Sequence, residues 1–551
     1  MSTAINGNAA HATTPLLAVE GLTVAYGDAE PVVRDISFAV EAGKMTAIVG
    51  ESGSGKTTSA MAALDLLGPS GNVLGGSIRF KGEELSKLSP AEWRTLRGAK
   101  IGLVPQDPNN SLNPLKTIGA SVEDGLEIHG VGDGESRRRQ AIALLERVGI
   151  DDPERSYHQY PHELSGGMKQ RVLIAAAVAL EPEVLIADEP TSALDVTVQK
   201  TILDLLDEMR AELGLGIIFI THDLAVAGDR ADDVVIMERG RVVEHGPVNQ
   251  VLTNPTQDYS KRLLANVPSL AVADAYHRPP VTTEPLLTVE GLTMRYGDFT
   301  AVEDISFDVA RGSTHALVGG SGSGKTTTGR AISMFNRPTA GSITLKGTEG
   351  TESTELTGLT PKQQRSLRGR VQMVYQNPFS SLDPKMRVGE IVAEPLRNLA
   401  GASKREALKR ADEFLARVAL DPAKFASRTP AQLSGGQRQR VAIARALIVE
   451  PELVVLDEAV SALDVTVQAQ ILELLEDLQR ELGLTYVFIS HDLAVVRQIS
   501  DTVSVFSRGH QVEYGDTNEV FTHPRHDVTR ELINAIPGTV FRARQLGEFV
   551  V

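Results

Sequence analysis

Short apolar runs alternate with amphipathic and polar segments along this chain, and the same order occurs in both halves. An opening segment, Leu17 to Val40 or Leu287 to Val309, alternates apolar and polar positions, which is typical of half-buried strands. Later come two continuous apolar runs, Val184–Ala187 and Leu453–Leu456, as expected for strands covered on both faces. Strands that alternate with helices indicate a parallel sheet, so we expect an α/β fold in each half.

Two further features complete the predicted pattern of each half. A strand-like run, Met45–Val49 or His315–Val318, leads into a glycine-rich loop and then a helical run. A charged, mostly helical segment follows, over about residues 107–163 in the first half and 377–432 in the second.

The two halves are copies of one domain. Ser52–Thr58 recurs at Ser321–Thr327, and the matching lysines, Lys56 and Lys325, are 269 positions apart. A period of that length indicates a duplicated domain and not a solenoid. The predicted boundaries are a disordered tail at 1–15, a first domain at 16–265, a proline-rich linker at 266–285, a second domain at 286–538 and a C-terminal tail at 539–551.

Composition excludes several kinds of protein. The chain has 551 residues, 55 Lys and Arg against 71 Asp and Glu, a net charge of −16 and no cysteine. Disulfides, Cys-ligated zinc and iron–sulfur clusters are therefore excluded, and the charge argues against a protein that coats nucleic acid. The most apolar run, Val172–Leu180, is 9 residues long, whereas a membrane-spanning helix needs about 20. Residues 1–15 lack the pattern of a signal peptide, so we expect a cytosolic chain unless a partner holds it at a membrane.

Both glycine-rich loops fit the phosphate-binding pattern G-x-x-x-x-G-K-[ST], at Gly50–Thr57 and Gly319–Thr326. Glycines let successive backbone N–H groups surround phosphate oxygens, the lysine neutralises the β- and γ-phosphates, and the threonine hydroxyl ligates Mg²⁺. The expected nucleotide contacts are Gly50, Ser52, Gly53, Gly55, Lys56, Thr57 and Thr58 in the first half and Gly319, Ser321, Gly322, Gly324, Lys325, Thr326 and Thr327 in the second.

Each continuous apolar strand ends in two acids, Asp188 and Glu189 in the first half and Asp457 and Glu458 in the second. The first acid of each pair is expected to reach Mg²⁺, and the second to orient or deprotonate the attacking water. A pair of solvated carboxylates at a strand end is the alternative, and the phosphate loop in the same half argues against it.

Three more pairs of side chains occupy equivalent places in the two halves. They are Gln106 and Gln376, His222 and His491, and Tyr26 and Tyr296. Each glutamine follows a strand-like run, where it could contact the metal and the water or form a turn before proline. Each histidine follows an apolar strand, at the edge where open α/β sheets bind ligands. Each tyrosine could stack on a base or pack within its strand.

Together these residues resemble the nucleotide-binding domains of ATP-binding-cassette (ABC) proteins, whose signature is similar to Leu164–Met168 and Leu433–Gln437. The resemblance implies two tandem P-loop ATPase domains, each with a parallel-sheet core, an antiparallel β subdomain and a helical subdomain. It also implies that the tyrosines stack on adenine, that the glutamines bind Mg²⁺, and that the histidines face the γ-phosphate. Ser192–Asp195 and Ser461–Asp464 would be the D-loops.

In that family two cassettes close head to tail around two ATP molecules, so the resemblance implies composite sites. One would combine Lys56, Asp188, Glu189 and His222 with Ser434 and Gly436, and the other Lys325, Asp457, Glu458 and His491 with Ser165 and Gly167. Both sets are complete, so both sites are predicted to hydrolyse ATP. Met168 replaces the usual signature glutamine, and Ala459 stands where the first half has Pro190.

Further segments resemble the peptide/nickel importer branch: Gln106–Pro114, Gln376–Pro384, Asn254–Tyr259 and His523–Asp527. That branch implies two membrane permease subunits, an extracytoplasmic solute-binding protein and a peripheral place on the cytoplasmic face of the membrane, with no nucleic acid. The alternatives are a soluble tandem ATPase acting on ribosomes or nucleic acid, and the energiser of an exporter. Peptides are the first guess for the solute, with nickel and glutathione left open.

Overall fold

A computed structural model describes residues 14–192, 194–267, 269–270, 284–347, 352–461 and 463–546. It divides into two compact units. Unit 1 contains residues 1–194, 198–270 and 537–551, and unit 2 contains residues 195–197 and 271–536. The expected disordered tail at 1–15 and linker at 266–285 lie largely outside the described residues.

Unit 1 holds two sheets. The four-stranded antiparallel sheet has the order β2-β1-β4-β5, and the six-stranded sheet has the order β10-β9-β3-β8-β7-β6. In the larger sheet β6, β7, β8, β3 and β9 are parallel, and β10 pairs antiparallel with β9. The strands are β1 Leu17–Tyr26, β2 Val33–Val40, β3 Met45–Val49, β4 Gly71–Phe80, β5 Glu83–Glu84, β6 Ile101–Val104, β7 Val184–Asp188, β8 Gly216–Thr221, β9 Asp233–Glu238 and β10 Arg241–Pro247.

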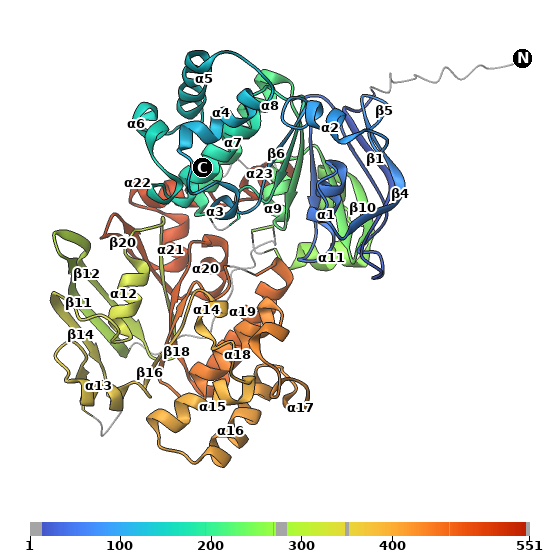
Figure 1. Cartoon of the computed structure of the whole chain (residues 1–551). Coiled ribbons are helices and arrows are strands. Elements are labelled where there is room, and N and C mark those ends of the chain that lie inside the picture. Colours follow the sequence, from blue (N-terminus) through green and yellow to red (C-terminus); the bar gives the residue numbers. More distant parts are fainter. Residues whose placement is uncertain are drawn as a thin grey trace, which may run out of the picture. The chain divides into compact units, whose positions relative to one another are not determined.

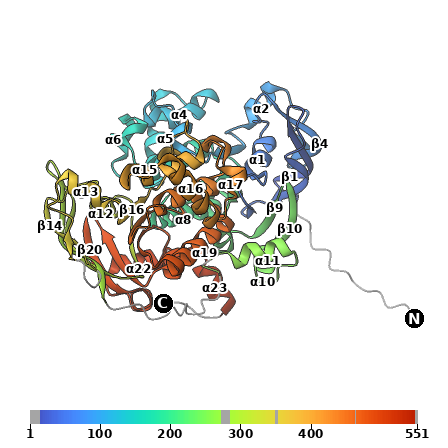
Figure 2. The same ribbon diagram turned by 90° about the horizontal axis from the view of Figure 1, so that it is seen from below.

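The helices of unit 1 form three groups: α1 and α2 by the sheets, α3 to α6 in the helical segment, and α7 to α11 after it. Their bounds are α1 Lys56–Ala63, α2 Pro90–Leu96, α3 Pro108–Ser111, α4 Ile118–Ile128, α5 Gly134–Arg147, α6 Pro153–His158, the 3₁₀ turn η1 Pro161–Glu163, α7 Gly166–Val178, α8 Val196–Leu213, α9 Leu224–Arg230, α10 Val248–Thr253 and α11 Asp258–Ala265. The last described helix of the chain, α23 Thr539–Leu546, also belongs to this unit. Figures 1 and 2 show α4 to α6 well apart from β1 and β4.

Unit 2 repeats both sheets, in the orders β12-β11-β14-β15 and β16-β17-β18-β13-β19-β20. Strands β16, β17, β18, β13 and β19 are parallel, and β20 is antiparallel to β19. The strands are β11 Pro285–Tyr296, β12 Phe299–Ala310, β13 Thr314–Gly319, β14 Ala340–Leu345, β15 Thr354–Glu355, β16 Val371–Val374, β17 Leu453–Asp457, β18 Thr485–Ile489, β19 Thr502–Ser507 and β20 His510–Asp516.

The helices of unit 2 follow the same order as those of unit 1. Their bounds are α12 Lys325–Ile332, α13 Pro361–Leu367, α14 Pro378–Ser381, α15 Val388–Leu399, α16 Lys404–Arg417, α17 Pro422–Phe425, η2 Pro430–Gln432, α18 Gly435–Leu447, α19 Val465–Leu482, α20 Leu493–Ile499, α21 Thr517–Thr522 and α22 Asp527–Asn534.

The expected α/β fold with two cassette-like domains is confirmed. The central strands β3, β7 and β8 are buried along their whole length, which explains their continuous apolar sequences. The segments predicted to be helical contain α3 to α6 and α14 to α17. None of the helices in the described ranges is long and apolar enough to cross a membrane.

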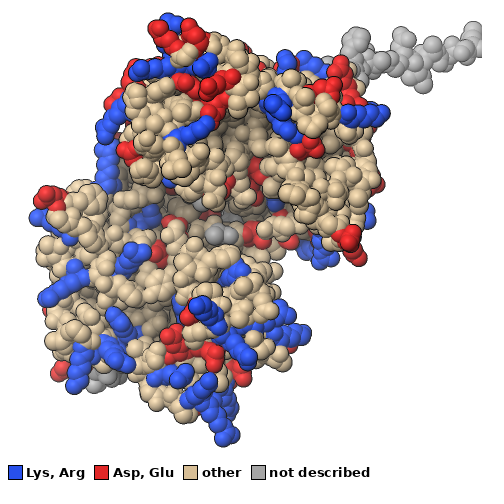
Figure 3. All heavy atoms as spheres, in the orientation of Figure 1, with Lys and Arg blue, Asp and Glu red and all other residues tan. Residues whose placement is uncertain are grey.

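Charge is unevenly distributed over the surface. Figure 3 shows Lys and Arg side chains gathered over the region of α15 to α17 in unit 2. Residues 377–432 carry ten Lys and Arg against seven Asp and Glu, whereas residues 107–163 carry six against eleven. The two helical segments therefore differ in the sign of their net charge, although their folds correspond.

Candidate nucleotide sites

The phosphate loop of unit 1 connects the buried strand β3 to α1. Gly55 lies directly before the helix with φ of 99°, a left-handed conformation that favours glycine. A Cβ atom on Gly55 would come within 3.1 Å of Val33 Cγ2, so a side chain here would also crowd β2. Ser52 and Gly53 lie in this loop, and Thr58 lies in the first turn of α1.

Lys56 is buried beneath this loop and has an exposed fraction of 5%. Its Nζ donates to the carbonyl oxygens of Gly50, at 2.7 Å, and Glu51, at 3.0 Å. The ammonium group is thus held by the curled backbone at the place where phosphate oxygens would enter. This arrangement is suited to a bound triphosphate.

Unit 2 has the same loop between β13 and α12. Lys325 Nζ donates to the carbonyl oxygens of Gly319 and Gly320, both at 2.8 Å. Gly324 has φ of 107°, and its Cβ would meet Val302 Cγ2 at 2.8 Å. Burial lowers the pKa of Lys325, while the charges of nearby carboxylates oppose this shift. Ser321 and Gly322 lie in the loop, and Thr327 follows in α12.

The threonine after each lysine meets the acid at the end of the neighbouring strand. Thr57 Oγ1 donates to Asp188 Oδ1 at 3.1 Å, and Thr326 Oγ1 donates to Asp457 Oδ1 at 2.9 Å. Burial, helped by the adjacent Glu189 charge, raises the pKa of Asp188 to about 6 against the opposing Thr57 hydrogen bond. A buried carboxylate beside a hydroxyl supplies the hard oxygen donors that Mg²⁺ prefers, and a cation would relieve this desolvation. The residues present therefore fit a magnesium ion.

The second acid of each pair is held by the predicted glutamine and histidine. Gln106 Nε2 donates to Glu189 Oε2 at 3.0 Å, and His222 Nδ1 lies 3.3 Å from the same oxygen. In unit 2, Gln376 Nε2 donates to Glu458 Oε2 at 2.7 Å, and His491 Nδ1 lies 3.4 Å from Glu458 Oε1. Residues that are far apart in sequence thus surround one carboxylate in each unit.

The charges of these groups depend on one another. Burial alone would raise the pKa of Glu189, but the hydrogen bond and charge of His222 outweigh it and lower that pKa. Burial would lower the pKa of His222, but Glu189 outweighs it and raises the pKa. The same directions hold for Glu458 and His491. Glu189 and Glu458 are thus kept ionised, the state in which a carboxylate can accept a proton from water.

The signature residues lie elsewhere, at the starts of α7 and α18. Ser165 accepts from the backbone N–H of Met168, and Ser434 accepts from that of Gln437. Gln437 also accepts from the Ser434 N–H and completes a capping box, which a methionine side chain cannot do. Gly167 and Gly436 lie in the first turns of these helices.

The two predicted adenine-stacking tyrosines end the first strand of each unit. Tyr26 ends β1 and Tyr296 ends β11, with exposed fractions of 36% and 50%. Asn336 donates to the Tyr296 hydroxyl at 2.7 Å. Both rings are accessible to a ligand, as stacking requires.

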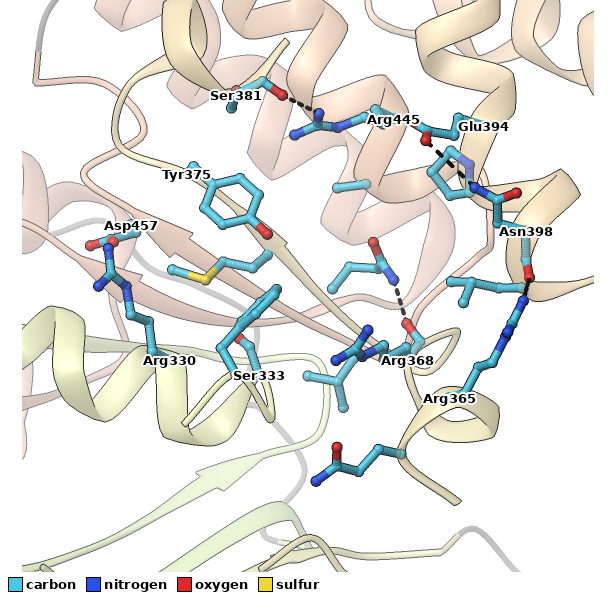
Figure 4. A pocket seen from close by; sticks show the side chains of 18 of the residues that line it. Arg330, Ser333, Arg365, Arg368, Tyr375, Ser381, Glu394, Asn398, Arg445 and Asp457 are labelled. Atoms are coloured by element: carbon cyan, nitrogen blue, oxygen red, sulfur yellow. Dashed lines mark hydrogen bonds between the residues drawn. The ribbon is translucent and has the colours of Figure 1, made fainter. Parts of the chain in front are cut away.

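A cavity of about 1000 Å³ in unit 2 was not anticipated from the sequence. Figure 4 shows Arg330, Arg368 and Arg445 around Tyr375, with Asp457 at one side. Arg445 Nη1 donates to the Ser381 carbonyl oxygen at 2.5 Å. The lining also includes Gln376 and Phe335, whose exposed fraction is 48%. The cavity is therefore basic and adjoins the second nucleotide site.

Each unit thus has the features of an ATP-binding P-loop protein: a lysine under the phosphate loop, a threonine–aspartate pair, and a glutamate contacted by a glutamine and a histidine. Comparison with known families identifies which one. The family model described as "ABC transporter" matches residues 33–192 and 302–461, and that described as "Oligopeptide/dipeptide transporter, C-terminal region" matches residues 512–549. The chain belongs to the ABC transporter family, in the peptide importer branch. It is an ATP-hydrolysing component that energises an importer and works with membrane permeases as a peripheral ATPase.

Two curated relatives match nearly the whole chain. The "Glutathione import ATP-binding protein GsiA" of Salmonella typhimurium (strain LT2) is 42% identical over 564 aligned residues, covering 95% of this chain and 89% of the relative. The protein of the same name from Escherichia coli O157:H7 is 40% identical with the same coverage. Each alignment therefore spans both halves of this chain.

Proposed function

We propose that this protein drives uptake of peptides or a related small solute such as glutathione, with ATP hydrolysis at two equivalent sites. The observation that carries the proposal is the repeated constellation around Glu189 and Glu458, with the same glutamine and histidine contacts in both units. The names of the two GsiA relatives, which are glutathione import proteins, support glutathione as one candidate. The match to the oligopeptide/dipeptide C-terminal region supports peptides.

The proposed roles follow from the contacts of each residue. Glu189 accepts the proton of the attacking water, while Gln106 and His222 hold its carboxylate in place. Lys56 would neutralise the phosphates, and Thr57 and Asp188 would hold Mg²⁺. When bound, the metal neutralises charge that develops on the phosphate oxygens. The corresponding residues of unit 2 act in the same way.

We propose that each site is completed by the signature of the other cassette. Ser434 and Gly436 would serve the site of Lys56, and Ser165 and Gly167 the site of Lys325. The support is their location at helix starts, where free backbone N–H groups favour an anion. ATP would then bind more tightly to the closed form than to the open form, so binding closes the cassettes and hydrolysis releases them.

The proposed partners are two permease subunits, fed by an extracytoplasmic solute-binding protein, with this chain on the cytoplasmic face of the membrane. The cavity of Figure 4 suits one permease segment that carries an acidic side chain, because four of its lining residues are arginines. These are Arg330, Arg365, Arg368 and Arg445. An occupant would contact the segment that bears Gln376, and so would connect the permease to the second ATP site.

The hydrolysis proposal is tested by Glu189→Gln combined with Glu458→Gln. Glutamine keeps the size of the side chain but cannot accept the proton, so turnover should fall about 100-fold or more. ATP binding should persist in equilibrium dialysis. The matched control is Glu212→Gln with Glu481→Gln, at equivalent exposed positions of α8 and α19, and it should retain full ATPase activity. Retained turnover in the first double variant would show that the base is another group.

The docking proposal is tested by Arg368→Glu in the assembled transporter. Charge reversal should repel the acidic permease segment, so permease-stimulated ATPase activity should fall about tenfold or more. ATPase activity of the chain alone should stay unchanged, because Arg368 lies over the Phe335 ring and is not one of the residues proposed to bind nucleotide or to act in hydrolysis. Arg337→Glu is the control, since Arg337 is exposed and does not line the cavity. Equal stimulation in both variants would place the permease contact elsewhere.

A further inference from the structure

The last described helix of the chain belongs to unit 1, although the elements directly before it belong to unit 2. Helix α22 ends at Asn534 in unit 2, and α23 packs beside α9 in unit 1. Figure 1 shows α23, in red, next to α9, in green. We call the described residues 537–546 the C-terminal segment.

The C-terminal segment is held by one carboxylate of α9. Asp229 Oδ2 accepts from the Gly538 N–H at 2.7 Å, and Asp229 Oδ1 accepts from the Phe541 N–H at 2.8 Å. The first N–H groups of a helix have no partners within the helix, and a side chain usually caps them. Gly538 has no side chain that could do so, and Asp229 supplies both acceptors from 309 and 312 positions away.

An apolar contact accompanies these hydrogen bonds. Phe541 has an exposed fraction of only 6%. A Cβ atom on Gly228 would lie 3.2 Å from Phe541 Cγ and 3.4 Å from Phe541 Cβ, so the absence of a side chain at Gly228 makes room for the ring. Arg542 Nη1 also donates to the Ser269 carbonyl oxygen at 3.4 Å.

The site on α9 that binds the C-terminal segment, formed by Gly228 and Asp229, is present in the first cassette and not in the second. At the positions of Gly228 and Asp229, the second cassette has Arg497 and Gln498. A long arginine would fill the space of the ring, and a neutral amide lacks the charge of the carboxylate. The two cassettes therefore differ at the surface that binds the C-terminal segment in the first.

Helix α9 also follows the predicted γ-phosphate histidine directly. Asp223, the residue after His222, caps α9 by accepting from the N–H groups of Ala225 and Val226. A Cβ on Gly538 would lie 3.3 Å from Ala225 Cβ, so the C-terminal segment also packs on the first turn of the helix.

We propose that the C-terminal segment is an intramolecular clasp that steadies α9, and with it the His222 loop, in the first cassette only. The two ATP sites then differ in the mobility of their histidine loops, although their catalytic residues match. The clasp is independent of the transported solute, so its tests are separate from those of the proposed function.

Docking of the clasp is tested by a disulfide between Gly228→Cys and Phe541→Cys. The chain has no cysteine of its own, and the 3.4 Å separation is close to the Cβ–Cβ distance of about 3.5–4.5 Å in disulfides. Mild oxidation should give a monomer with altered mobility on a non-reducing gel, reversed by a reductant. Arg497→Cys with Phe541→Cys is the matched control and should stay open. Equal cross-linking in both pairs, or none in the first, would overturn the proposal.

The effect on α9 is tested by hydrogen exchange of the full chain without nucleotide. Phe541→Ala should speed exchange in Leu224–Arg230 about threefold or more and leave Leu493–Ile499 unchanged. Val540→Ala changes an exposed neighbour and should alter neither helix. Unchanged exchange in α9, or an equal rise in both helices, would overturn the proposal.

Discussion

Glu189 and Glu458 have left-handed backbones, with φ of 44° and 46°. For a residue with a Cβ atom this conformation costs about 1–2 kcal/mol. A hydrogen bond holds each one in place: the Glu189 N–H donates to the Ile220 carbonyl oxygen, and the Glu458 N–H to that of Ile489. Both acceptors lie in the strand that precedes the histidine, so one backbone contact brings glutamate and histidine together in each unit.

The buried residue His315 should make the stability of unit 2 depend on pH. It is fully buried, Thr502 and Ser504 lie 2.8 and 2.9 Å from its ring nitrogens, and burial lowers its pKa to about 3. The folded state keeps the ring neutral, whereas the unfolded chain takes up a proton below about pH 6.5. Stability should therefore fall as pH decreases from about 6.5 towards 3, by up to about 1.4 kcal/mol per pH unit.

His315→Thr, which introduces the residue found at the equivalent position 46, should remove this part of the slope. Denaturant unfolding at pH 7 and pH 5 gives the free energy of unfolding at each pH. The change between the two pH values is compared, because the smaller side chain also alters the stability at both. His523→Thr is the control, since this histidine is exposed. The same slope in the wild type and His315→Thr would contradict the prediction.

Among the elements, the central strands could be predicted from sequence because continuous apolar runs identify strands covered on both faces. β7 and β17 are such strands, and both are buried at every position. The position of α23 could not be predicted from sequence, because Asp229 and Gly538 are 309 positions apart and no local pattern connects them. The arginine-lined cavity could not be predicted for the same reason, since its lining comes from several separate elements, among them α12, α13, α15, β16 and α18.

The start of α18 gives a prediction about packing between helices. A Cβ atom on Gly436 would lie 2.4 Å from Val467 Cγ1 in α19, whereas one on Gly435 would meet only Leu463 Cδ2, at 3.7 Å. Alanine favours a helix by about 1 kcal/mol over glycine, but overpacking costs about 1–3 kcal/mol. Gly436→Ala should therefore be about 1–3 kcal/mol less stable than Gly435→Ala in denaturant unfolding.

The second change Val467→Ala should restore much of the stability lost in Gly436→Ala, because it removes the clashing methyl groups. If the two single alanine variants are equally stable, α18 and α19 accommodate the added methyl group with no loss in the free energy of unfolding, and the prediction is wrong.

For the whole molecule, duplication preserves the chemistry and varies the surfaces. Both units keep the lysine, threonine, aspartate, glutamate, glutamine and histidine contacts at closely similar distances. Their helical segments differ in net charge, and only the first receives the C-terminal segment. The sequence repeat could predict the shared chemistry, whereas the differences depend on contacts that a repeat does not specify.

Two sites with matching residues predict that each chain binds two nucleotides. In the Glu189→Gln/Glu458→Gln background each chain should bind two ATP molecules, and Lys56→Ala or Lys325→Ala should each leave one. Hydrogen bonds to charged groups contribute about 1.5–3 kcal/mol, so removing either buried ammonium should weaken its own site about 10- to 150-fold. Equilibrium dialysis measures the stoichiometry, with the exposed Lys87→Ala as control. Loss of both nucleotides in a single lysine variant would mean that ATP binds the two sites only together, because closure of the cassettes would then require both lysines.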